Sequence, residues 1–155
     1  MLIRPVEPRD IPRINEMLGQ ILKLHADLRP DIFRHEREKY TPDELEALLK
    51  QPERPAFVAE TDGVCIGYAL CEIRDTPASP HLVARRVLYL DDLCVDEAFR
   101  GKGIGRALTD CVLAYAESIN ADALELNLWE ANTDAAAFYE HLGFKTQCRH
   151  MEMAL

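Results

Sequence analysis

The residues from Arg100 to Arg106 have the types and spacing of a phosphate-binding turn. They read Arg-Gly-Lys-Gly-Ile-Gly-Arg, and apolar residues then recur at helical spacing as far as Ile119. A turn that opens a helix leaves backbone N–H groups free to bind an anion. Glycines have no Cβ atom, so a ligand can approach the backbone closely. The segment therefore predicts a phosphate or pyrophosphate site, and its positions are Arg100, Gly101, Lys102, Gly103, Ile104, Gly105 and Arg106.

Two common phosphate-binding motifs do not fit this turn. A P-loop requires Gly-Lys followed by Ser or Thr, whereas this chain has Gly105-Arg106-Ala107. The dinucleotide fingerprint requires Gly-x-Gly-x-x-Gly, and here the third glycine comes one residue too early. An ordinary glycine-rich turn between a strand and a helix is an alternative that the turn alone leaves open.

Two adjacent carboxylates precede the turn, within the apolar run Leu88–Val95. The run is short and partly β-branched or aromatic, which predicts a buried strand. Because side chains alternate along a strand, we expect Asp91 and Asp92 to face opposite sides of the sheet. Each carboxylate can take a proton from a reacting group or hold a structural hydrogen bond, and both interpretations stay open.

Together with a second segment, the turn resembles the GNAT acyltransferases, the GCN-related N-acetyltransferase superfamily. Their pyrophosphate loop reads Arg/Gln-x-x-Gly-x-Gly/Ala after a strand ending in valine, and the chain matches it at Val95, Arg100, Gly103 and Gly105. Their second signature is similar to this chain at Asn132, Ala136, Phe138, Tyr139, Gly143 and Phe144. The two segments stand in the family's order and cover a little over a third of the chain.

The resemblance implies an α/β GNAT fold. Its mixed central sheet has antiparallel N-terminal strands, a parallel splayed pair in the middle and helices on both faces. It also implies acetyl-CoA as cosubstrate, with the pyrophosphate on the turn and the pantetheine arm along the end of the strand, where an N–H of Leu93 or Cys94 polarises the thioester. The implied contacts are Leu93, Cys94, Val95, Arg100, Gly101, Lys102, Gly103, Ile104, Gly105, Arg106, Asn132 and Tyr139.

The implied reaction is the direct attack of a primary amine on the thioester, without a covalent enzyme intermediate. Tyr139 matches the family's acid, and a phenol holds its proton at neutral pH. Asp91 is the candidate base, because Tyr-Leu-Asp-Asp is similar to the strand of the spermidine/spermine acetyltransferase branch. The other candidates for the base are Glu72, Tyr89 and Glu130. Two structural alternatives stay open: Tyr139 packing on the sheet, and Asn132 opening a helix.

Composition limits the classes of function. The 155 residues predict one domain, 1–155, and the net charge of −9 argues against general nucleic-acid binding. The charge favours a small cationic amine as acceptor, and a peptide N-terminus or a lysine is the alternative acceptor. The alternative to an enzyme is a non-catalytic module that binds acyl-CoA. Five cysteines without a Cys-x-x-Cys pair indicate neither disulfides nor a metal site. With no apolar segment long enough to span a membrane, we expect a cytoplasmic protein. Many members of the GNAT superfamily form homodimers, so the resemblance also implies that this chain could form one.

Periodicity and turn signals predict the elements that hold these residues. Two patterns are local: Thr41-Pro-Asp-Glu44 is a capping box, and Asp62-Gly63 is a hairpin turn. Asp10 is expected to cap the first helix, and Thr133 or Asp134 the last. The expected strands are 2–7, 56–60, 64–73, 88–95, 123–129 and a final one from Phe144 to Met153, and the expected helices are 10–25, 42–49, 104–118 and 135–142.

Overall fold

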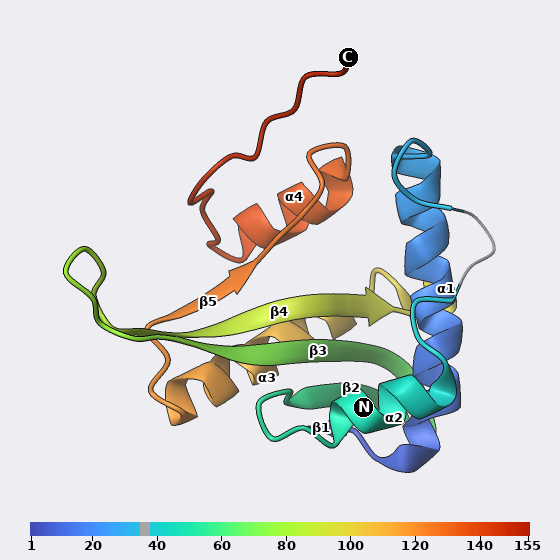
Figure 1. The fold of residues 1–155 in the computed structure, drawn as a ribbon. Helices are drawn as coiled ribbons and strands as arrows, with labels where there is room; N and C mark the ends of the chain where they lie inside the picture. The colour runs from blue at the N-terminus through green and yellow to red at the C-terminus, as the bar shows by residue number, and fades with distance from the viewer. Residues whose placement is uncertain (35–37) are drawn as a thin grey trace.

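The computed structural model describes residues 1–34 and 38–155. Its five strands form one sheet in the order β1-β2-β3-β4-β5 (Figure 1). Neighbouring strands are antiparallel except for β4 and β5, which are parallel. The elements are β1 (Leu2–Pro5), η1 (Pro8–Asp10), α1 (Ile11–Leu28), α2 (Pro42–Leu49), β2 (Ala56–Thr61), β3 (Val64–Thr76), β4 (Arg85–Val95), η2 (Glu97–Phe99), α3 (Ile104–Ser118), β5 (Ala123–Leu126) and α4 (Thr133–His141).

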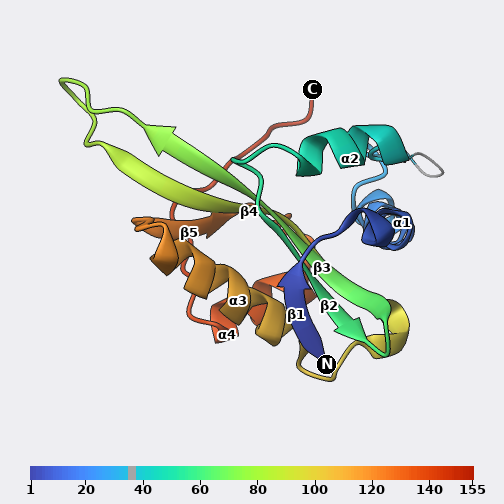
Figure 2. The same cartoon turned by 90° about the horizontal axis from the view of Figure 1, so that it is seen from below.

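Helices cover both faces of the sheet, so the fold is the α/β architecture expected from the sequence. Figure 2 shows α1 and α2 on one side of the strands and α3 and α4 on the other. The core is correspondingly divided in two. One cluster includes Ile14, Met17 and Leu45 beneath α1 and α2, and the other includes Leu108 and Val112 beneath α3. Burial of these apolar side chains is the main force that holds the helices on the sheet.

Several local predictions are confirmed. Asp62 and Gly63 have φ values of 52° and 77°, as a tight hairpin turn requires. The hydroxyl oxygen of Thr41 accepts a hydrogen bond from the N–H of Glu44, and the carboxylate of Glu44 accepts one from the N–H of Thr41. Gly67 interrupts the predicted strand 64–73, which indicates a bulge or the close approach of another backbone. The structure shows the close approach, since a Cβ there would be 3.0 Å from the carbonyl oxygen of Cys94. These features depend on few residues or on one missing side chain, so sequence alone indicates them.

Other boundaries differ from expectation. The side chain of Asp10 does not cap α1; it accepts hydrogen bonds from Arg4 and from the N–H of Glu7. β4 begins at Arg85, three residues early, because the ladder with β3 extends to the pair Thr76 and Arg85. Residues 27–39 are polar and interrupted by Pro30, which predicts a loop or short helical pieces. In the structure α1 continues to Leu28, and residues 35–37 lie outside the described part.

The predicted final strand is wrong. Residues 144–155 contain no strand, and from Lys145 onward they are exposed. The alternation of apolar and polar residues supplies β propensity, but a strand also needs a partner with free backbone groups along its edge. The segment makes scattered contacts instead, such as Gln147 to Glu125 at 3.2 Å and Arg29 to Glu152 at 2.6 Å.

Among the described residues, no helix is both long and apolar enough to cross a membrane.

Candidate functional site

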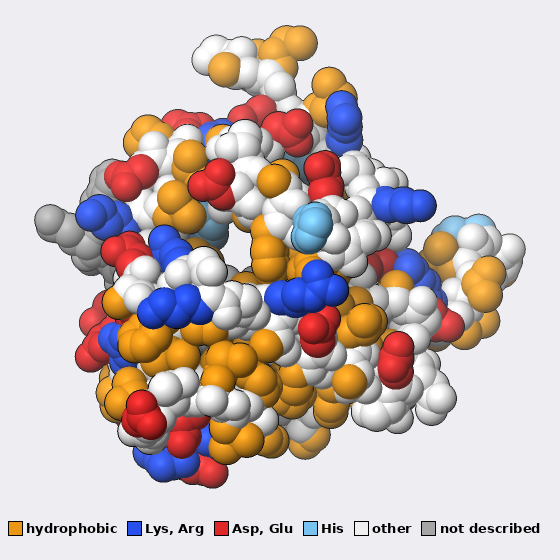
Figure 3. All heavy atoms as spheres, turned by 180° about the vertical axis from the view of Figure 1, so that it is seen from behind, with side chains coloured by type: hydrophobic (Ala, Val, Ile, Leu, Met, Phe, Trp, Pro, Cys, Tyr) orange, Lys and Arg blue, Asp and Glu red, His pale blue; other side chains and the backbone are white. Residues whose placement is uncertain are grey.

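The site begins where β4 and β5 separate. Their parallel register runs only from the pair Val87 and Ala123 to the pair Leu90 and Leu126. β4 continues to Val95, and none of its last five residues pairs with β5, while the four from Asp92 to Val95 still pair with β3. β5 ends at Leu126 rather than at the expected Trp129, because its pairing with β4 ends there. The space-filling view shows an opening through the middle of the molecule (Figure 3).

A β-bulge lies at the point of separation. Leu70 pairs with Asp92, but the next residue, Cys71, pairs with Leu90, so Asp91 is an extra residue in β4. A bulge interrupts the alternation of side chains, and neighbouring residues can then approach the same group. Both carboxylates accordingly lie near the ammonium of Lys39: its Nζ is 3.0 Å from Asp92 Oδ2 and 3.6 Å from Asp91 Oδ2. The expectation that the two carboxylates face opposite sides is therefore wrong.

The two carboxylates differ in accessibility. The side chain of Asp92 is 6% exposed and also accepts a hydrogen bond of 3.0 Å from the hydroxyl of Tyr68, which is fully buried. The side chain of Asp91 is 29% exposed. Burial of Lys39 lowers the pKa of its ammonium, but the charges of Asp92 and Asp91 outweigh this and leave the pKa above its ordinary value. Asp92 is thus held by two partners, whereas Asp91 is the carboxylate that a ligand can reach.

An aromatic group extends from the end of α1 to the chain after β5. The ring of Phe33 lies 5.1 Å from that of His25 and 5.4 Å, edge to face, from that of Trp129. The guanidinium of Arg29 lies 5.3 Å from the Trp129 ring centroid. Burial lowers the pKa of His25, while the charge of Asp92 opposes this and that of Lys39 adds to it. His25 is therefore within electrostatic reach of the acidic pair, so the aromatic group belongs to the same region.

The glycine-rich turn opens helix α3, as its sequence predicts. Gly101 and Gly103 are left-handed, with φ values of 75° and 78°, and a Cβ at either would meet no atom within 4 Å. Gly103 is the N-cap of α3 and has no side chain to cap the helix, so the first N–H groups of this 15-residue helix have no acceptor within the helix. Arg100 and Lys102 fold back onto carbonyl oxygens of the preceding residues, at 3.0 and 3.4 Å. The capacity to bind an anion therefore resides mainly in the backbone.

Gly105 has a different environment. A Cβ at this position would lie 3.3 Å from Cζ of Phe138 and 3.8 Å from Cγ2 of Val95. The absence of a side chain thus lets α4 pack closely against the beginning of α3. This contact also fixes where Tyr139, the next residue of α4, lies relative to the turn.

Tyr139 is largely buried between two aromatic neighbours. Its ring centroid is 5.0 Å from that of Phe138 and 5.4 Å from that of Phe144, and it packs against the core beneath α3. Burial raises the pKa of its hydroxyl well above the ordinary value, and the negative charge of Asp92 raises it further. The phenol therefore keeps its proton at neutral pH and lies within electrostatic reach of the acidic pair.

Asn132 opens α4. Its Oδ1 accepts a hydrogen bond of 3.2 Å from the N–H of Ala135, so Asn132 is the N-cap and the expectation of Thr133 or Asp134 is wrong. At the other end Gly143 has a φ of 95°, and the N–H of Phe144 bonds the carbonyl of Tyr139, as in a Schellman ending. Both ends of this nine-residue helix are thus fixed, which positions the Tyr139 side chain.

Comparison with known proteins agrees with this arrangement of the β4 edge, the glycine-rich turn and α4. The sequence model of the Acetyltransferase (GNAT) family matches residues 20–144. The chain belongs to the GNAT acetyltransferase family. An uncharacterized N-acetyltransferase of Methanocaldococcus jannaschii is 30% identical over 74% of this chain and half of its own. The peptidyl-lysine N-acetyltransferase YjaB of Salmonella typhimurium is 31% identical over 79% of this chain and 68% of its own.

Solved structures show the same GNAT fold. A mutant of the BH1408 protein of Bacillus halodurans has a TM-score of 0.96 and 31% identity, covering 100% of this chain and 99% of its own. The aminoglycoside N-acetyltransferase AAC(6')-Iy in complex with CoA has a TM-score of 0.74 and 19% identity, covering 99% and 98%. The chain spans half the length of its Methanocaldococcus relative, so that relative contains further sequence.

Within this GNAT domain the other candidate bases are paired with arginine side chains or are exposed. Glu72 pairs with Arg74 at 2.9 Å and with Arg54 at 3.5 Å. The ring of Tyr89 is covered by the guanidinium of Arg74 at 3.5 Å from its centroid. Glu130 is exposed. Asp91 remains the carboxylate with both access and a place beside the open strand edge, and its role as the base stays a prediction.

Cys94 is the cysteine nearest the proposed thioester site. It is buried, and burial raises the pKa of its thiol to about 12. A thiol in this state is a poor nucleophile at neutral pH, because the thiolate is the reactive form. Among the described residues, no group of three or more His, Cys, Asp or Glu side chains is placed to hold a metal ion.

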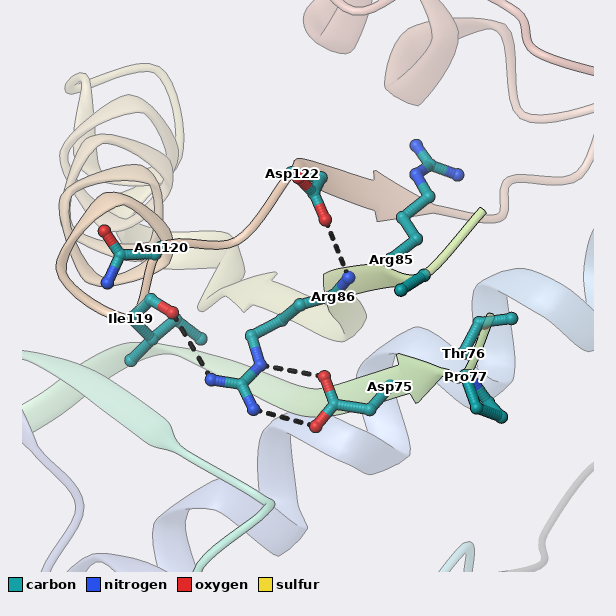
Figure 4. Close-up of a pocket in the computed structure, with 9 residues that line it drawn as sticks. Asp75, Thr76, Pro77, Arg85, Arg86, Ile119, Asn120 and Asp122 are labelled. Carbon is teal, nitrogen blue, oxygen red and sulfur yellow. Dashed lines mark hydrogen bonds and ion pairs between the residues drawn. The ribbon is translucent and has the colours of Figure 1, made fainter. Parts of the chain in front are cut away.

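A second hollow, of about 480 Å³, lies at the far end of β4 (Figure 4). Arg86 spans it: its guanidinium bonds both carboxylate oxygens of Asp75 at 2.8 Å, and its backbone N–H bonds Asp122 at 2.8 Å. These charged groups satisfy one another, so they tie β3, β4 and the α3–β5 connection together.

Sequence reasoning did not find Lys39, Tyr68, Phe33 or Trp129. Trp129 is the single tryptophan and follows a strand, which is a weak signal. Lys39 and Tyr68 lie 53 and 24 residues from Asp92, and no local pattern connects them with it.

Proposed function

We propose that the protein is an acetyl-CoA-dependent N-acetyltransferase that acetylates a primary amine, and that the amine is a small cation. The observation that carries the proposal is the open edge of β4 from Asp91 to Val95. It runs from the acidic pair at one end towards the glycine-rich turn at the other. Such an edge offers backbone groups to an extended ligand, and the turn offers helix N–H groups to a pyrophosphate.

The residues present fit the cosubstrate. Gly101 and Gly103 leave open space above the N-terminus of α3, as a pyrophosphate requires. Leu93, Cys94 and Val95 lie on the open edge, where the pantetheine arm would pair. Bound acetyl-CoA supplies the thioester carbon that the amine attacks. The remaining contacts predicted from sequence, Arg100, Lys102, Ile104, Gly105, Arg106 and Asn132, belong to or adjoin the turn and α4.

The protein's own groups supply proton transfer. Asp91 takes the proton that the acceptor ammonium must lose before it can attack. Tyr139 holds a proton because its pKa is raised, and it donates that proton to the departing thiolate. Asp92, fixed by Tyr68 and Lys39, adds negative charge that favours a cationic acceptor next to Asp91.

The alternative acceptor is a lysine or the N-terminus of a peptide. The name of the Salmonella relative supports lysine, and so does the ammonium of Lys39, which lies on the acidic pair as an acceptor lysine would. A small amine is favoured by the net charge of −9 and by the aromatic group of His25, Phe33 and Trp129 beside the pair. A panel that contains both free amines and lysine peptides separates the two.

Two measurements test the proposal. Isothermal titration of acetyl-CoA should show micromolar binding, as expected for a substrate. Release of CoA thiol with a panel of amines should then show turnover that depends on Tyr139. Binding without turnover of any amine would leave a non-catalytic acyl-CoA-binding module, and absence of binding by the folded protein would refute the proposal.

A further inference from the structure

The acidic pair already holds an amine of the class that the proposed reaction consumes. Lys39 Nζ lies 3.0 Å from Asp92 and 3.6 Å from Asp91, and the Lys39 side chain is only 29% exposed. Its third neighbour is the ring of Tyr40, whose centroid is 5.4 Å away. The amine of Lys39 thus contacts the carboxylate that is proposed to deprotonate the acceptor.

Lys39 differs from an ordinary surface lysine of the same chain. Lys50 is 71% exposed and pairs with Glu46 one helical turn away, at 2.7 Å. Such a pair on a helix surface contributes little and leaves the amine in water. Lys39 instead reaches from a connecting segment to the middle of the sheet, where Asp92 is 53 residues away in sequence. The two lysines therefore provide a matched comparison within one molecule.

The position of Lys39 relative to the open edge completes the geometry. Asp92 is followed directly by Leu93, where the edge expected to receive the thioester begins. The carboxylate that holds Nζ is therefore adjacent in sequence to the residue where this edge begins. Holding a nucleophile beside its electrophile replaces a bimolecular encounter with an intramolecular one, which strongly favours reaction.

We propose that Lys39 is an internal acetyl acceptor, acetylated by the acetyl-CoA bound to the same chain; this rests on the proposed function. Asp91 accepts one proton from the Lys39 ammonium, and the neutral Nζ attacks the thioester carbonyl carbon. The C–N bond forms, and the C–S bond breaks with its electron pair on sulfur. Tyr139 donates its proton to the sulfur. The nitrogen then loses its second proton, which passes through water to the phenolate of Tyr139 and restores the phenol. Asp91 releases its proton to solvent. One amide, one CoA thiol and one proton result.

Acetylation of Lys39 would change the site itself. The amide carries no charge, so it cannot form an ion pair with Asp91 or Asp92. The acidic pair then becomes available to the ammonium of an external amine. Before modification, the ammonium of Lys39 thus competes with the external amine for the acidic pair. After acetylation it no longer does.

The test is mass spectrometry of the full chain after incubation with acetyl-CoA alone. Peptides obtained by cleavage at glutamates give the acetylated fraction at Lys39 and at Lys50 from the same sample. We expect Lys39 to react about 100-fold faster than Lys50, as general acid–base catalysis permits, although Lys50 is more exposed. The rate per molecule should not change with protein concentration. Lys39→Arg should remove the modification, and Lys50→Arg should not slow it at Lys39.

Each contrary outcome has a distinct meaning. Equal rates at Lys39 and Lys50 would indicate uncatalysed chemistry and would overturn the proposal. A rate that rises in proportion to protein concentration would show transfer between molecules and would also overturn it. If the protein binds acetyl-CoA and turns over an external amine while Lys39 stays unmodified, only this inference fails. If calorimetry shows no binding of acetyl-CoA, the proposed function fails with it.

Discussion

The role of the glycine-rich turn can be tested with two substitutions of equal size at Gly103. This residue has a φ of 78°, is the N-cap of α3, and has open space where a Cβ would be. Asn and Asp are the residues that best tolerate a left-handed backbone, and both are good N-caps. Gly103→Asn and Gly103→Asp should therefore fold alike and share any steric effect on the ligand. They differ in one negative charge.

The size of the charge effect follows from Coulomb's law. Two like unit charges about 5 Å apart at a surface with an effective dielectric constant of about 20 repel by about 3 kcal/mol. Screening by physiological salt reduces this to about 2 kcal/mol. Since about 1.4 kcal/mol is a factor of ten in affinity, Gly103→Asp should bind acetyl-CoA about 30-fold more weakly than Gly103→Asn.

Isothermal titration at two salt concentrations measures this difference. The difference should shrink at high salt, because the repulsion is screened. Thermal unfolding is the control: Gly103→Asp should be at least as stable as Gly103→Asn, since a carboxylate at a helix N-terminus is favourable. Equal dissociation constants for two folded variants would refute the placement of the pyrophosphate on this turn.

Four further outcomes are expected. Tyr139→Phe should lower kcat about 100-fold or more while acetyl-CoA binding is kept, and unchanged kcat in steady-state assays would exclude the acid role. Asp92→Asn should cost about 1–3 kcal/mol in urea unfolding, because one buried and one partly buried hydrogen bond are disturbed; an unchanged midpoint would contradict this. Burial raises the pKa of the Asp10 carboxyl, but its hydrogen bonds to Arg4 outweigh burial and leave this pKa below its ordinary value of 3.8. The ionised Asp10 therefore stabilises the fold above pH 3.8, and this contribution is lost as the pH falls through the lower pKa of the folded state. Unfolding of Asp10→Asn should accordingly depend less on pH below 4. Removing residues 145–155, whose methionines are over 80% exposed, should abolish a homodimer of the kind that many relatives form in sedimentation experiments, whereas a wild type that is monomeric throughout would refute it.

Sequence alone determined the features that depend on neighbouring residues. The hairpin at Asp62 and Gly63, the capping box at Thr41 and the left-handed glycines before α3 follow from local backbone preferences. The parallel pairing of β4 and β5 also follows, because a strand, helix and strand in succession have one favoured handedness and arrangement. The candidate acid, Tyr139, and the turn were predicted because both signatures are continuous segments.

Tertiary structure decided what depends on distant partners. The bulge at Asp91 arises from the register of β4 against β3, and it reverses the expected facing of one carboxylate. Lys39 and Tyr68 lie beside Asp92 only in the folded chain, because they are 53 and 24 residues away from it in sequence. The alternation after Phe144 indicates a strand, yet no strand forms there, since pairing requires an edge that the sequence of the segment does not contain. Local backbone preferences depend on adjacent residues and can be predicted from them. Strand pairing and the meeting of distant side chains depend on the fold of the whole chain.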